Sequence, residues 1–223
     1  MRDIELAAIE GGTLIRRVGR ARETVEVAPF EIGVFAVTEE ELAELLGVPS
    51  RHPRRPAVEV SWQRAVRWCN AASEWEGLDP AYRIDGDEVR WDGTADGYRL
   101  PTETEWEFAC RAGSPAAQYG PLAEVAYTAA DGLRAPADVG GRHPNLHGLF
   151  DTLGNVWEWC WDPFDPEDPS AGRVFRGGGF TDGPLNVRAD VRRGARASAV
   201  FDDVGFRAAR GPGPAPEGRS RRR

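Results

Sequence analysis

Lysine is absent from this chain, and methionine is nearly so. Every basic side chain apart from histidine belongs to arginine, and the only methionine is Met1. Without lysine the protein cannot form a Schiff base with a carbonyl substrate or hold pyridoxal phosphate covalently. Without an internal methionine, no thioether can contribute to a copper site within the fold.

Cysteine is scarce, and its three positions are far apart in the sequence: Cys69, Cys110 and Cys160. An odd, scattered set in apolar surroundings is a poor disulfide framework. We therefore expect reduced, buried thiols that pack as small hydrophobic groups.

Long apolar runs are also missing. No segment approaches the roughly 20 apolar residues of a membrane-spanning helix, and the first residues lack the apolar stretch of a signal peptide. We expect a cytoplasmic protein that does not engage a membrane. The net charge of −8 over 223 residues argues against a nucleic-acid partner.

The chain divides into a domain over residues 1–210 and a tail over residues 211–223. The tail is rich in proline, glycine and arginine, a composition that cannot build a core, so we expect it to be disordered. Within the domain, capping patterns predict helices that begin after Thr38, Ser61 and Thr102. The first ends at Gly47 and the third before Gly113. From Ala116 onward no helix is predicted.

Strands are predicted between and after these helices. The first 37 residues read as short strands and turns. Asp85-Gly86 separates two extended segments, 81–84 and 88–91, as in a hairpin. Residues 173–176 and 204–207 are typical of final sheet strands.

The most informative segment is Gly154-Asn155-Val156-Trp157-Glu158-Trp159-Cys160-Trp161-Asp162. Side chains alternate along a strand, so the three indoles should share one face and Glu158 should project from the other. A carboxylate buried beside this much aromatic surface is costly unless a cation or a hydrogen-bond donor meets it. The segment therefore predicts a partner for Glu158. A stripe of this kind usually belongs to the core, although it could also stack on a flat ligand.

Four segments, in this order, resemble the formylglycine-generating enzyme (sulfatase-modifying factor) family. They are residues 97–109 (GYRLPTETEWEFA), 144–151 (PNLHGLFD), 154–159 (GNVWEW) and 173–180 (RVFRGGGF) with the closing Gly205-Phe206-Arg207. The resemblance covers nearly all of residues 8–210. It implies a loop-rich α+β fold related to C-type lectins, with few short helices and twisted antiparallel strands.

The resemblance also implies a calcium site. Carried onto this sequence, it consists of the carboxylates of Asp151 and Glu158 and the carbonyls of Gly154 and Val156. Hard oxygen ligands from a tight loop suit Ca²⁺. The alternative is that Glu158 pairs with an arginine, such as Arg176 or Arg207, and that no metal binds.

Members that oxidise a sulfatase cysteine to formylglycine hold copper(I) with two cysteines, and this chain departs from them there. The corresponding positions are Asp182 and either Asn186 or Val187. Copper(I) requires soft thiolates, which these side chains cannot supply. We therefore expect no copper site and no formylglycine-generating activity.

Two functional hypotheses remain. The first is a binding or accessory domain that takes a small molecule or a peptide in a cleft near Asp182, Asn186, Arg188 and Arg192; equally, the arginines of this region could be structural. The alternative is an oxidoreductase of the non-heme iron type acting on a thiol or peptide. It would need His143, His147 or a nearby carboxylate as ligands.

Overall fold

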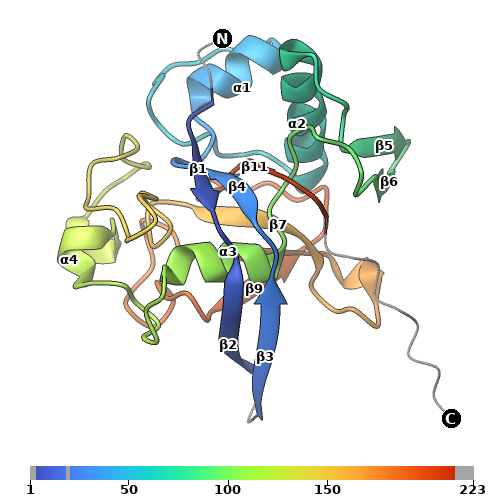
Figure 1. The fold of residues 1–223 in the computed structure, drawn as a ribbon. Helices are drawn as coiled ribbons and strands as arrows, with labels where there is room; N and C mark the ends of the chain where they lie inside the picture. Colours follow the sequence, from blue (N-terminus) through green and yellow to red (C-terminus); the bar gives the residue numbers. More distant parts are fainter. Residues whose placement is uncertain (1–3, 19–20, 214–223) are drawn as a thin grey trace, which may run out of the picture.

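The computed structural model describes residues 4–18 and 21–213, and its four α-helices are short (Figure 1). They are α1 (Glu39–Leu46), α2 (Trp62–Glu76), α3 (Glu103–Arg111) and α4 (Leu122–Val125), with single 3₁₀ turns at Ala129–Asp131 and Pro169–Ala171. The predicted caps are confirmed. Thr38 and Thr102 each form a reciprocal capping box, and Ser61 accepts a hydrogen bond from the Arg64 amide. The expectation of no helix after Ala116 is wrong, because α4 follows Pro121.

The strands form four small sheets. The first has the order β1 (Leu6–Ile9), β4 (Phe30–Gly33), β11 (Ala209–Arg210) and the second the order β10 (Val204–Phe206), β7 (Trp157–Pro163), β8 (Arg173–Arg176), β9 (Arg192–Ala195). Two hairpins complete the set, β2 (Gly12–Val18) with β3 (Ala21–Val27) and β5 (Tyr82–Asp85) with β6 (Glu88–Trp91). The strands β6 and β8 match the predicted bounds, and β5 and β10 match theirs to within a residue. All pairings are antiparallel except that of β10 with β7.

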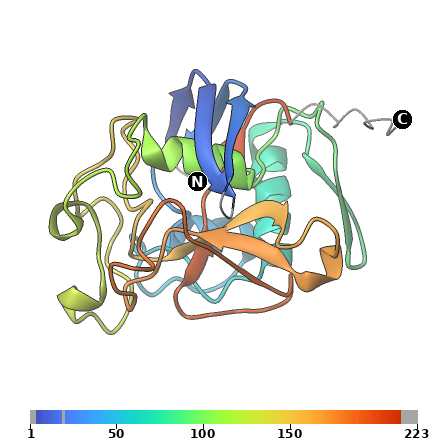
Figure 2. The ribbon, with the colours of Figure 1, turned by 90° about the horizontal axis from the view of Figure 1, so that it is seen from below.

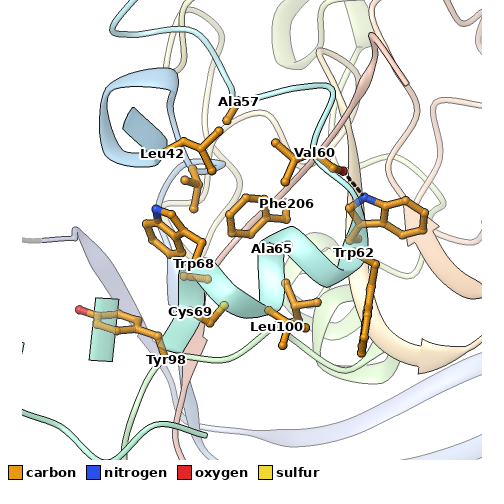
Figure 3. Close-up of a cluster of buried hydrophobic side chains, with 14 of the residues drawn as sticks. Leu42, Ala57, Val60, Trp62, Ala65, Trp68, Cys69, Tyr98, Leu100 and Phe206 are labelled. Atoms are coloured by element: carbon orange, nitrogen blue, oxygen red, sulfur yellow. Dashed lines mark hydrogen bonds between the residues drawn. The ribbon is translucent and has the colours of Figure 1, made fainter. Parts of the chain in front are cut away.

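Strand β7 separates two parts of the core. Trp157 and Trp159 pack on one side with the inward face of α2 and with Phe206 of β10; several members of this cluster are drawn in Figure 3. Cys160, on the opposite face of β7, packs with Trp106 of α3. The predicted alternation along this strand is therefore correct, and its tryptophans belong to the core. A third cluster joins the N-terminal strands to α3.

Figure 2 shows the N-terminal strands beside α3, with α2 and the β5–β6 hairpin on one side and the loops that follow α3 on the other. The predicted tail lies mostly outside the described residues. Its first residues contact the domain: the Gly211 carbonyl accepts a hydrogen bond from Arg99, and the Gly213 amide donates one to the Gly93 carbonyl. Among the described residues, no helix is long and apolar enough to cross a membrane.

Candidate functional site

Glu158 is met by Arg207. Both side chains are fully buried, and the guanidinium donates to the carboxylate through Nε (3.0 Å) and Nη2 (2.7 Å). The Trp106 indole donates a third hydrogen bond to Glu158, at 2.7 Å. Burial acts to lower the pKa of Arg207, but Glu158 outweighs this effect and the pKa is raised. The partner that the sequence required is thus an arginine, held at a distance and geometry typical of a strong bidentate pair.

Arg207 also ties three segments together. Its remaining donors reach the carbonyls of Gly33 (2.6 Å), Val34 (2.8 Å) and Phe150 (2.8 Å). The ion pair therefore joins β7 and β10 to the end of β4 and to the loop before Asp151. Such a pair is costly to break, because the group that is left behind stays charged and buried.

Asp151 lies beside this pair with an unsatisfied oxygen. Its backbone has a φ of 56°, a conformation that is uncommon outside glycine. Oδ2 accepts a hydrogen bond from the Gly140 amide at 2.7 Å, whereas the buried Oδ1 has no partner in the described part of the chain. Burial raises the pKa of Asp151 to about 6; Gly140 and Arg207 oppose the shift, and Glu158 adds to it.

These contacts bear on the calcium prediction. Asp151 Oδ1 is a hard, buried oxygen without a donor, which suits a cation. The charge of Glu158 is already neutralised by Arg207. Of the three hydrogen bonds described above, its Oε2 accepts two and its Oε1 accepts one, so Oε1 is the oxygen with a free lone pair for a cation. Among the described residues, no group of three or more His, Cys, Asp and Glu side chains is placed to hold a metal. The donors therefore fit calcium only if backbone carbonyls complete the set, as Gly154 and Val156 are predicted to do.

Several groups donate hydrogen bonds to the carboxylate of Asp182, which lies in the loop after β8. Its Oδ2 accepts hydrogen bonds from the Trp157 indole (2.7 Å) and the Gly179 backbone amide (3.0 Å), and its Oδ1 accepts one from the side-chain Nδ2 of Asn186 (2.8 Å). Arg193 approaches the same carboxylate at 3.5 Å. Asp182 is buried, and its hydrogen bonds connect this loop to Trp157 of β7.

The four cleft candidates do not share one contact site. Asp182 and Asn186 are in contact, as described. Arg188 forms a bidentate pair with Asp190 at 2.8 and 2.7 Å, and Arg192 forms another with Glu103 at 2.8 and 3.0 Å. Arg188 and Arg192 thus have structural partners of their own.

Sequence reasoning missed a buried network beneath α3. Arg176 donates to Glu103 at 2.5 Å and to Glu107 at 2.6 Å, and it also donates to the Ala189 carbonyl. Glu107 additionally pairs with Arg111 one turn later on the helix. The spacing of Glu103 and Glu107 by four residues was the available signal, because it places two carboxylates on one helix face.

The histidines are not gathered into a metal site. His143 is exposed, and His147 packs beside the Phe108 ring, with centroids 6.0 Å apart. In the part of the chain that the structure describes, neither belongs to a cluster of three potential metal ligands. The described residues therefore provide no set of iron ligands that would support the hypothesis of a non-heme iron oxidoreductase. The three cysteines are buried and free, as predicted.

Comparisons with known proteins agree with the fold and with the sequence resemblance. Residues 4–212 match the family described as sulfatase-modifying factor enzyme 1-like domain. The chaperone protein LppX of Paenibacillus barcinonensis is 28% identical over 92% of this chain and 89% of its own length. The inactive C-alpha-formylglycine-generating enzyme 2 of Mus musculus is 30% identical over 87% of this chain and 79% of its own length.

A formylglycine-generating enzyme and two solved structures complete the comparison. The enzyme, from Streptomyces coelicolor, is 32% identical over 70% of this chain, which spans only 53% of the enzyme's length. The structure of Treponema denticola variable protein 1 matches with a TM-score of 0.84 and 25% identity over 93% of this chain and 95% of its own. PvdO from Pseudomonas aeruginosa shares the fold, with a TM-score of 0.76 and 24% identity over 92% of this chain and 93% of its own.

Proposed function

Because the chain belongs to the sulfatase-modifying factor enzyme 1-like family, we propose that it acts as a ligand- or peptide-binding accessory domain and not as a formylglycine-generating enzyme. Two relatives carry names compatible with such a role, one a chaperone protein and one an inactive C-alpha-formylglycine-generating enzyme. The observation that supports the proposal most directly is the environment of Asp182.

Asp182 stands where the resemblance places the first copper thiolate. Its two oxygens accept hydrogen bonds from Trp157, Gly179 and Asn186. A carboxylate held in this way is a hard acceptor and offers copper(I) no soft ligand. Of the two residues that correspond to the second position, Val187 is fully buried and packs in the cluster with Trp106, and Asn186 donates to Asp182. The loop is therefore built around a structural carboxylate and an apolar anchor.

The surface beside Asp182 combines apolar and cationic groups. Leu185, in the same loop, is 82% exposed. The Arg193 guanidinium lies 4.6 Å from the centre of the Trp157 ring, and Phe201 packs against Phe175 with centroids 6.0 Å apart. Arg193 approaches Asp182, which lies in the same loop as Leu185. An exposed aliphatic group and an arginine at one loop suit a peptide that brings both an apolar and an acidic side chain. We assign ligand binding to this surface.

The test separates binding from catalysis with a single peptide. A labelled peptide carrying Cys-x-Pro-x-Arg and a glutamate is incubated with the protein, copper, a reductant and oxygen, then analysed by mass spectrometry, and its binding is followed by fluorescence anisotropy. We expect binding without the mass decrease that converts a thiol to an aldehyde. Leu185→Asp should weaken binding, whereas Leu146→Asp, at another highly exposed leucine on a different loop, should not. Formation of the aldehyde would overturn the proposal, and so would binding that both variants leave unchanged.

We also propose that the protein binds a calcium ion and that this ion has a structural role. Asp151 and Glu158 would hold it together with the carbonyls of Gly154 and Val156, and its charge would neutralise the carboxylate of Asp151. Calcium supplies no redox chemistry. Its expected effect is on the stability of the turn that leads into β7.

A further inference from the structure

A groove lies between the β2–β3 hairpin and the body of the domain, lined mainly by β2 with Arg22 of β3. It encloses about 570 Å³ between the hairpin, the C-terminal end of α3 and the segments 113–117 and 188–190. The hairpin extends beyond α3, away from the β1–β4 sheet (Figure 1). The groove does not involve Asp182 or Asn186, so it is distinct from the surface assigned above.

The backbone of β2 is unpaired on the groove side. Within the described residues, β2 and β3 form a sheet of two strands, so each strand has one edge without a neighbour. Four consecutive residues of β2 line the groove, Thr13, Leu14, Ile15 and Arg16. Because successive side chains of a strand point to opposite faces, a run of four lining residues means that the strand presents its edge. No backbone hydrogen bond among the described residues joins β2 to anything but β3.

The lining of the groove is rich in arginine, although the protein as a whole is acidic, and one of these arginines has no carboxylate partner among the described residues. Its lining includes four arginines and a single carboxylate, that of Asp190. Arg16, Arg111 and Arg188 are held in place by ion pairs with neighbouring carboxylates, whereas Arg22 forms no ion pair within the described part of the chain. The whole chain carries a net charge of −8. A cationic lining on such a background selects for an anionic partner.

Apolar groups lie among these charges. Ile15 is 63% exposed, and Phe108 of α3 also lines the groove. An extended peptide with alternating acidic and apolar side chains would match both sets at once, because its side chains also alternate between two faces. A second copy of β2 would fit less well, since it would bring another Arg16 into an already basic groove.

We propose that the groove binds an acidic, extended peptide segment of a partner protein, which adds as a strand to the free edge of β2. Backbone hydrogen bonds to β2 provide the affinity, and the arginines select the acidic side chains. This interaction does not depend on the function proposed for the Asp182 surface.

The experiment uses a labelled, end-blocked peptide of alternating glutamate and valine, as long as β2. Its affinity for the full chain is measured by anisotropy at low and high salt. We expect binding that weakens with salt and falls about fivefold or more in Arg22→Glu, since a rim charge is reversed. Arg90→Glu reverses an exposed arginine on the other hairpin and should leave the affinity unchanged. Hydrogen exchange of the β2 amides should slow when the peptide binds.

Four results would overturn the proposal. The first is the absence of binding, and the second is equal weakening by Arg22→Glu and Arg90→Glu. The third is unchanged affinity for both of two N-methylated peptides, one methylated at the odd and one at the even residues, because strand addition needs one of these two sets of N–H groups. The fourth is protection of the β2 amides by dimerisation of the protein alone, which would assign this edge to a second copy. Circular dichroism of each variant verifies that it folds.

Discussion

The Glu158–Arg207 pair provides the sharpest test of how this fold is held together. Replacing Glu158 by Gln keeps the shape and an acceptor for the Trp106 indole. It removes the one carboxylate that, among the described residues, forms an ion pair with the fully buried Arg207 guanidinium. A glutamine oxygen in the place of Oε2 would still accept from Arg207 Nε, but the glutamine NH2 would face Nη2, donor against donor. The charge of the guanidinium would then be met only by neutral groups, this amide and the carbonyls of Gly33, Val34 and Phe150. Removing one partner of a buried pair costs about 3–5 kcal/mol. At about 2–4 °C per kcal/mol for a domain of this size, Tm should fall by roughly 10 °C.

The assay is urea unfolding followed by tryptophan fluorescence, performed in a chelator so that calcium cannot contribute. Glu88→Gln is the control, because Glu88 pairs with Arg90 on the surface and should cost at most about 1 kcal/mol. The double variant Glu158→Gln, Arg207→Met should lose less free energy of unfolding than the two single variants combined. If Glu158→Gln costs no more than the surface control, Arg207 is not the uncompensated buried charge that the geometry describes, and the reasoning fails.

The sequence was sufficient for features that depend on near neighbours. The capping boxes at Thr38 and Thr102 involve residues three positions apart, so each helix start was predictable. The alternation of Trp157, Glu158 and Trp159 likewise depends only on strand geometry. Helix α4 was missed because it is a single turn without a side-chain cap, and it lacks the apolar periodicity by which longer helices are recognised.

The partner of Glu158 could not be chosen from the sequence, because both arginines come close to it in the sheet. Arg176 is its neighbour across β7 and β8, and Arg207 directly follows β10, which pairs with β7 on the other side. The choice depends on α3, whose Glu103 and Glu107 engage Arg176 and leave Arg207 for Glu158. Which arginine pairs with which carboxylate therefore depends on how α3 packs against the sheet, and the sequence alone does not give this. Among the four cleft candidates, this cause applies to Arg192, whose partner Glu103 lies on α3, whereas Arg188 pairs with Asp190 two residues further along the chain.

Three further predictions concern calcium, the thiols and the pH dependence of stability. Added calcium should raise the Tm of the parent protein and a chelator should lower it. Asp151→Asn should have the same Tm with calcium and with chelator, because the substitution removes the carboxylate charge. An unchanged Tm in the parent protein would refute the site. Native protein should react with a thiol reagent only as fast as it unfolds. Burial raises the pKa of all three cysteine thiols, that of Cys110 to about 12, so the reactive thiolate is not formed in the folded state. Rapid labelling of the native protein would contradict this prediction. Burial also raises the pKa of Asp162 from 3.8 to about 6, although the Glu103 amide donates to its carboxylate at 2.6 Å and opposes the shift. A carboxyl whose pKa is higher in the folded state stabilises that state below pH about 4, and this contribution is lost as the pH rises through about 6. Asp162→Asn keeps an acceptor for the Glu103 amide and does not ionise, so it should be more stable than the parent at pH 8 by about 1–3 kcal/mol, an advantage that should disappear near pH 4. Asp165→Asn, at an exposed position of the same segment, should show no such trend in urea titrations across this range. A constant difference between Asp162→Asn and the parent at every pH would show that Asp162 does not titrate as its burial requires.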